Sequence, residues 1–172
     1  VGTDLWIEKK VAGGAADPKE HFTFVLTKTS LAGTSYSVSY EGIAENDGAG
    51  HQETLTFDGN GVARLSLKNG EKARILQMPS GDVQIKEENG DYVTKVTVNG
   101  ISEKYSDASG IKIQLSSEKT ELVFTNQLDA QPPTGAELLS VPYWLMGGTA
   151  LAGLLGSRIT GSRRKDRKKK FF

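Results

Sequence analysis

Apolar and polar residues alternate in short runs through most of the first 127 residues. This period of two is typical of strands with one buried face, and sequences such as DGNG, KNGE, PSGD and ENGD separate the runs as turns. Hardly any run has helical spacing. The pattern predicts an all-β domain over residues 1–128, a sandwich of two antiparallel sheets. The predicted strands are Leu5–Val11, Phe22–Thr29, Tyr36–Tyr40, Glu53–Phe57, Gly61–Leu67, Ala73–Leu76, Asp82–Glu88, Tyr92–Val98, Ile111–Leu115 and Glu121–Asn126.

Three of these strands carry a polar residue on a face that is otherwise apolar. Side chains two residues apart point to the same side of a strand. Their neighbours Lys10 and Glu88 fall on the opposite faces, where we expect them to be solvated. The three rows are Leu5, Ile7, Lys9 and Val11 in the first strand, Val83, Ile85 and Glu87 in a middle strand, and Leu122, Phe124 and Asn126 in the last.

A lysine, a glutamate and an asparagine that meet in an apolar interior can react with one another. Burial disfavours charged forms, so it lowers the pKa of a lysine and raises the pKa of a glutamate. A neutral amine is a nucleophile, and a protonated acid can stabilise the tetrahedral intermediate on the amide. Loss of ammonia would leave a Lys-Asn isopeptide bond. The other interpretation is a buried Lys9–Glu87 salt bridge with Asn126 merely ending a strand, which is costly unless its geometry is good.

The end of the sequence changes character abruptly. From Leu138 to Gly156 there are 19 consecutive uncharged residues, enough to cross a hydrocarbon core as a helix. From Arg158 onward eight Lys and Arg stand against one acid, a net charge of +7, and the rest of the chain carries −7. Basic residues after an apolar span stay in the cytoplasm. We therefore predict a transmembrane helix over residues 136–157, a basic cytoplasmic tail over 158–172 and an extracellular body.

A linker over residues 129–135 precedes this span and ends in the pentapeptide Gln131-Pro132-Pro133-Thr134-Gly135. Pentapeptide, apolar span and basic tail together resemble the C-terminal sorting signal of Gram-positive surface proteins, whose usual form is Leu-Pro-any-Thr-Gly. The resemblance implies that a sortase cuts between Thr134 and Gly135 and transfers the Thr134 carboxyl group to an amine. The polar Gln131 resembles signals read by sortases dedicated to pili. The membrane would then hold the precursor only.

The body also resembles a known family, the isopeptide-containing domains of Gram-positive pilins and surface stalks. These include the streptococcal pilin isopeptide linkage domain and the Cna B-type sandwiches, which have an Ig-like fold. The resemblance makes Lys9 the amine donor, Asn126 the acceptor and Glu87 the catalytic acid. The matching pieces are DLWIEKKVAG, FTFVLT, MPSGDVQIKEENGDY and LVFTNQ.

Several other function classes find little support in the composition. There is no cysteine, so disulfides are excluded, and two separated histidines, His21 and His51, poorly support metal or imidazole chemistry. We recognise no Ser-His-Asp set, phosphate loop or metal cluster, and expect neither a cofactor nor an enzyme acting on an external substrate. The acidic body argues against a nucleic-acid partner.

These features together predict the C-terminal part of a longer protein in the cell wall or pilus of a Gram-positive bacterium. The favoured function is a pilin subunit that a sortase joins through Thr134 to another pilin subunit or to a peptidoglycan cross-bridge. The alternative is a wall-anchored adhesin, in which this domain is a stalk spacer for an N-terminal binding domain. Upstream sequence would separate the two.

Overall fold

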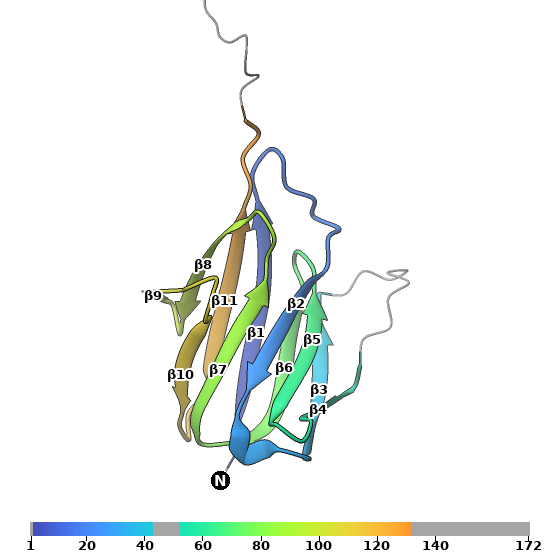
Figure 1. The fold of residues 1–172 in the computed structure, drawn as a ribbon, viewed down its shortest axis with the longest axis vertical. Coiled ribbons are helices and arrows are strands. Elements are labelled where there is room, and N and C mark those ends of the chain that lie inside the picture. The colour runs from blue at the N-terminus through green and yellow to red at the C-terminus, as the bar shows by residue number, and fades with distance from the viewer. Residues whose placement is uncertain (1, 43–51, 132–172) are drawn as a thin grey trace, which may run out of the picture. The chain divides into compact units, whose positions relative to one another are not determined.

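Eleven strands and one short 3-10 helix make up residues 2–42 and 52–131, the part of the chain that the computed structural model describes (Figure 1). All ten predicted strands are present with small shifts at their ends, so the all-β prediction is confirmed. The elements are β1 (Gly2–Ala12), β2 (Phe22–Thr27), η1 (Thr29–Leu31), β3 (Ser35–Glu41), β4 (Thr54–Thr56), β5 (Val62–Leu67), β6 (Lys72–Pro79), β7 (Gly81–Glu88), β8 (Val93–Val98), β9 (Ile101–Glu103), β10 (Ile111–Leu115) and β11 (Thr120–Gln127).

The strands form two sheets, one with the order β4-β3-β6-β1-β11-β8-β9 and the other with the order β10-β7-β2-β5. The expectation that both sheets are antiparallel is wrong at one place, because β1 and β11 pair in parallel. Figure 1 shows these two strands side by side in the middle of the larger sheet, running in the same direction. The folded chain therefore enters β1 at one end of the sandwich and leaves β11 at the other.

The core lies between the inner faces of the two sheets. Its buried residues include Leu5 and Ile7 on β1, Phe24 on β2 and Phe124 on β11, all fully shielded from solvent. The rings of Phe24 and Phe124 meet edge to face with centroids 4.9 Å apart, so the two sheets are in direct contact. Each such side chain contributes about 1.5–3 kcal/mol through burial. The alternation read from the sequence is thus the alternation between core and surface.

Strand β9 is absent from the sequence-based prediction. It pairs with β8 through a hairpin whose two turn residues, Asn99 and Gly100, have φ of 50° and 84°. Two consecutive positive φ values are what a tight two-residue hairpin turn requires, and Asn-Gly is its preferred sequence. The Asn99-Gly100 dipeptide could therefore have predicted this hairpin from the sequence. Strand β2 also ends earlier than predicted, at Thr27, because the chain turns into η1.

The structure leaves the C-terminal predictions untested. Within residues 2–42 and 52–131 no helix is long and apolar enough to cross a membrane. The predicted span over 136–157, the basic tail and the cleavage motif from Pro132 onward lie outside the described residues, and so does His51.

Candidate functional site

The three polar residues predicted on apolar faces come from three different strands and lie in the core. Lys9 is on β1, Asn126 is on the neighbouring β11, and Glu87 is on β7 of the opposite sheet. Lys9 and Asn126 are 0% exposed and Glu87 is 1% exposed. Lys10 and Glu88 are exposed, as expected for the opposite faces. Strand parity therefore selects Glu87, and not the adjacent Glu88, as the acid in the interior.

Lys9 and Glu87 are in direct contact. The Nζ atom of Lys9 lies 2.7 Å from Oε2 of Glu87 and 4.3 Å from the centroid of the Phe22 ring. Burial lowers the pKa of Lys9 to about 8, although the Glu87 charge opposes this shift. Burial also raises the pKa of Glu87, against the opposing effects of Lys9, Asn126 and Thr94. Both shifts favour a neutral amine beside a neutral acid.

Asn126 is held from the adjacent strand by Thr94. The two residues face each other in the antiparallel pairing of β11 with β8, and the Thr94 hydroxyl lies 2.9 Å from Oδ1 of Asn126. The amide nitrogen Nδ2 is buried and has no partner of full hydrogen-bond geometry among the described residues. The carbonyl end of the amide is therefore held by Thr94, while the nitrogen that an isopeptide reaction expels faces the Glu87 carboxyl group and opposes the rise in its pKa that burial causes.

Aromatic rings surround this cluster. Phe22 packs edge to face on Tyr92, and Tyr105 packs edge to face on Phe124, with centroid separations of 5.1 Å and 5.7 Å. The Tyr105 hydroxyl also accepts a hydrogen bond of 2.8 Å from the backbone N–H of Glu87, which fixes the strand that carries the acid. The apolar rings keep the dielectric low, which strengthens every polar contact inside.

Sequence reasoning missed two other buried charged residues, Lys28 and Glu71. Lys28 follows Phe22, Phe24 and Leu26 on the inward parity, so alternation alone could have found it. Its Nζ donates to the backbone carbonyls of Ser80 and Asp82 at 3.1 Å and 3.2 Å. Glu71 Oε1 accepts the backbone N–H of Lys68 at 2.9 Å. Both side chains stabilise turns through hydrogen bonds to the backbone, and neither belongs to the group of Lys9, Glu87 and Asn126.

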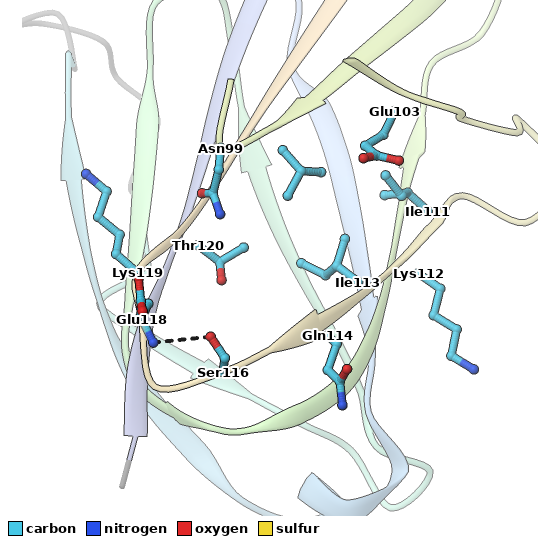
Figure 2. Close-up of a pocket in the computed structure, with 11 residues that line it drawn as sticks. Asn99, Glu103, Ile111, Lys112, Ile113, Gln114, Ser116, Glu118, Lys119 and Thr120 are labelled. Carbon is cyan, nitrogen blue, oxygen red and sulfur yellow. Dashed lines mark hydrogen bonds between the residues drawn. The ribbon is translucent and has the colours of Figure 1, made fainter. Parts of the chain in front are cut away.

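A surface groove of about 360 Å³ lies at the open seam of the sandwich, between the β8–β9 hairpin and β10. Figure 2 shows three consecutive residues of β10, Ile111, Lys112 and Ile113, among those that line it. None of the three cluster residues lines this groove. Because isopeptide chemistry needs water to be excluded, the buried cluster is the better candidate site. In residues 2–42 and 52–131 no group of His, Cys, Asp and Glu could hold a metal ion.

These observations place the domain among two-sheet β-sandwiches. Its first and last strands pair in parallel, and its core holds a Lys-Glu-Asn cluster. The chain belongs to the family described as a domain of unknown function, DUF7601, whose model matches residues 3–128.

Two curated relatives are pilus proteins of Streptococcus pyogenes. The chain is 28% identical over 162 residues to a pilin of serotype M1, covering 89% of this chain and 47% of the pilin. It is 33% identical over 131 residues to the pilus tip adhesin Cpa, covering 76% of this chain and 18% of the adhesin. The chain thus spans less than half the length of either relative.

Solved structures of the same two kinds of protein share the fold. The pilus-presented adhesin Cpa superposes with a TM-score of 0.57 at 23% identity, covering 76% of this chain and 28% of that chain. The major pilin from Streptococcus pyogenes gives a TM-score of 0.56 at 22% identity, covering 75% of this chain and 48% of that chain. The sandwich is therefore a fold found in pilus proteins.

Proposed function

We propose that this chain is the C-terminal part of a sortase-processed pilin subunit whose domain is closed by an isopeptide bond between Lys9 and Asn126. The observation that carries the proposal is the buried contact of Lys9 with Glu87, together with the interaction of the Asn126 amide with the same carboxyl group. Homology to a streptococcal pilin and a pilus adhesin supports the structural or adhesive role.

The reaction forms one bond and breaks one. Glu87 takes a proton from the Lys9 ammonium, and the neutral Nζ attacks Cγ of Asn126. The tetrahedral intermediate collapses when Glu87 passes this proton to Nδ2 and takes the second proton from Nζ, the Cγ–Nδ2 bond breaks and ammonia leaves. Glu87 thus ends the event as the neutral acid, having relayed one Lys9 proton and kept the other, and no cofactor or oxidant is needed. The reaction occurs once per chain, on the chain itself.

A permanent salt bridge is the competing account of the same contact. A buried ion pair must offset the desolvation of two charges, and hydrogen bonds to the remaining polar atoms are needed for that. Here neither Nζ of Lys9 nor Oε2 of Glu87 has a further partner of full hydrogen-bond geometry among the described residues. As a permanent ion pair, Lys9 and Glu87 therefore recover little of the free energy that desolvating their two charges costs. The pair is well suited to a reaction that removes the charge on Lys9 altogether.

The position of the bond suits a protein that bears tension. Lys9 lies near the end of β1, Asn126 lies near the end of the parallel β11, and the chain enters and leaves at opposite ends of the sandwich. Force applied at the two ends would pass along β1 to Lys9, cross to Asn126 and leave the domain. The 116 intervening residues would carry no load. This is the property expected of a pilus shaft or a surface stalk.

Sortase processing between Thr134 and Gly135 completes the proposal. The Thr134 carboxyl group would be joined to a lysine of another pilin subunit or to a peptidoglycan cross-bridge, and the apolar span and basic tail would serve the precursor only. The second candidate, a stalk domain of a wall-anchored adhesin, is favoured by the 33% identity to the tip adhesin Cpa. The two candidates share the domain chemistry and differ in what lies upstream.

Peptide mapping tests the bond directly. Tryptic digestion of the denatured 172-residue chain should give a branched peptide in which the Lys9 segment is joined to the Asn126 segment. The Glu87→Ala chain should give the two segments as separate peptides. Separate peptides from the wild-type chain would contradict the proposal.

A further inference from the structure

The hydroxyl group of Thr94 lies where an isopeptide reaction would build up negative charge. We propose that Thr94 is a catalytic residue of this reaction, because its hydroxyl donates to Oδ1 of Asn126 and stabilises the oxyanion of the tetrahedral intermediate. The inference rests on the proposed function, since an oxyanion forms at Asn126 only if Lys9 attacks it.

The backbone fixes the position of Thr94 relative to Asn126. They are direct partners in the antiparallel β8–β11 pairing, a relationship that brings Cβ atoms to about 4.5–5.5 Å. The hydroxyl oxygen lies 2.9 Å from Oδ1, within the 2.7–3.1 Å range of oxyanion-hole donors. Both residues sit inside regular strands, so this donor is held in place before the reaction begins.

The neighbours of Thr94 direct its single proton toward Asn126. A hydroxyl donates one hydrogen bond and accepts two. Nδ2 of Asn89 lies 2.5 Å from the Thr94 hydroxyl and 2.9 Å from Oδ1 of Asp107. Because a carboxylate only accepts, the Asn89 atom facing Asp107 is the amide nitrogen, and the same nitrogen donates to Thr94. Asn89 is buried, so it acts as a positioning residue that occupies one acceptor site of the hydroxyl.

Glu87 is the other neighbour of the hydroxyl. Its Oε1 atom lies 3.4 Å from the Thr94 oxygen, while its Oε2 atom contacts Lys9. While Glu87 is a carboxylate, its Oε1 competes with Oδ1 of Asn126 for the single Thr94 proton, and the contact to Oδ1 is the shorter, 2.9 Å against 3.4 Å. Once Glu87 has taken the Lys9 proton, it is neutral and a weaker acceptor, so the Thr94 hydroxyl donates to the developing oxyanion.

The negative charge on Oδ1 of Asn126 rises and falls during the reaction. As Nζ of Lys9 bonds to Cγ of Asn126, the carbonyl electron pair moves onto Oδ1, and the Thr94 hydrogen bond strengthens. When the Cγ–Nδ2 bond breaks, the pair returns and the C=O bond re-forms, while Glu87 passes its proton to the leaving nitrogen and takes the second proton of Nζ. Thr94 keeps its own proton throughout. Its contribution is therefore made in the transition state rather than in the starting structure.

Timed mass spectrometry of newly made chain tests this role. The 172-residue chain is synthesised in a cell-free system, samples are quenched in acid denaturant, and the fraction lacking one ammonia is followed. Thr94→Val keeps the side-chain shape without the hydroxyl and should slow bond formation on the order of a hundredfold. Thr94→Ser keeps the hydroxyl and should stay within about tenfold of the wild type. Thr97→Val, on the opposite face of β8, is the matched control and should leave the rate unchanged.

A merely structural role for Thr94 predicts a different result. Thermal unfolding in a Glu87→Ala background, where no bond forms, measures what Thr94→Val costs the fold alone. If Thr94→Val chains are folded and form the bond at the wild-type rate, or if Thr94→Ser is as slow as Thr94→Val, the inference is overturned. Should Thr94→Val not fold, Thr94→Cys replaces it, because a thiol of similar size is a weak donor. A wild-type chain that never loses ammonia would instead overturn the proposed function.

Discussion

The Nζ atom of Lys9 lies 2.7 Å from Oε2 of Glu87, and neither side chain is exposed to solvent. Burial pushes the pKa of the amine down to about 8 and the pKa of the acid up, so both groups are drawn toward their uncharged forms. An uncharged amine beside an amide and an acid is a reactive arrangement. The following predictions separate this arrangement from a permanent ion pair.

The first prediction concerns pH and uses Asn126→Ala, a chain that cannot form the bond. Because the pKa of Lys9 is about 8 when folded and 10.5 ordinarily, the unfolded chain binds more protons between these values. The free energy of unfolding should therefore rise with pH in this window, by up to about 1.4 kcal/mol per pH unit from Lys9. Below the window the cost of burying the charged amine is fully present.

Glu87 acts at the acid end of the same experiment. Its pKa is raised by burial, so the folded Asn126→Ala chain retains a proton that the unfolded chain loses above the ordinary value of 4.5. Stability should fall as the pH rises from there through the folded pKa. Urea unfolding over a pH series measures both effects. In the wild-type chain Lys9 is an amide and the alkaline rise should be missing, so an equal rise in both chains would contradict the account.

The second prediction concerns stability at neutral pH. A bond between Lys9 and Asn126 closes a loop around 116 residues, and a cross-link of that span stabilises by roughly 4–5 kcal/mol in the chain-entropy description. Urea unfolding should show Asn126→Ala less stable than the wild type by at least this amount. Loss of the Thr94 hydrogen bond alone costs about 1 kcal/mol, so a difference of only that size would count against the bond. Thr125→Ala, on the opposite face of β11, is the control.

The third prediction concerns force. A single chain pulled between handles before β1 and after β11 should not release the residues between Lys9 and Asn126. In Glu87→Ala the same pull should release them, with an extension of about 400 Å for 116 residues at roughly 3.5 Å each. Single-molecule force spectroscopy makes the comparison. Wild-type chains that extend as far as the Glu87→Ala chains would refute the load path.

The fourth prediction concerns the cleavage motif. Incubation with a pilus sortase and an amine should release the segment that begins at Gly135 and leave the amine on Thr134. Thr134→Ala and Gly135→Ala should each stop the release, whereas Pro133→Ala, at the variable position of the motif, should not. Mass spectrometry identifies the products. Release that persists in both Thr134→Ala and Gly135→Ala would rule out this site.

Much of the site could be predicted from the sequence, because strand alternation is a local property. Counting by twos placed Lys9, Glu87 and Asn126 on inward faces, and the structure finds each of them buried. The same count assigns Lys28 to the interior, and the sequence-based interpretation overlooked it. The count also places Thr94 on the same face of β8 as the buried Val96. The sequence therefore indicated the face of Thr94 but not its position beside Asn126.

Which distant strands pair with each other could not be predicted from the sequence in the same way. Alternation gives the faces of a strand but neither its neighbour nor its direction, so the parallel contact of β1 with β11 could not be predicted. The partners of Thr94 depend on that sheet order, because β8 reaches Asn126 only as the other neighbour of β11. The short strand β9 was missed because three exposed residues show no alternation, although Asn99-Gly100 marks its turn.

The intact mass of the 172-residue chain tests the central claim most directly. The wild-type chain should be lighter than its sequence by one molecule of ammonia, and Glu87→Ala should have the full mass of its sequence. Lys10→Ala, next to Lys9 but on the solvent face, should still show the deficit. A wild-type chain with the full mass of its sequence would contradict the account.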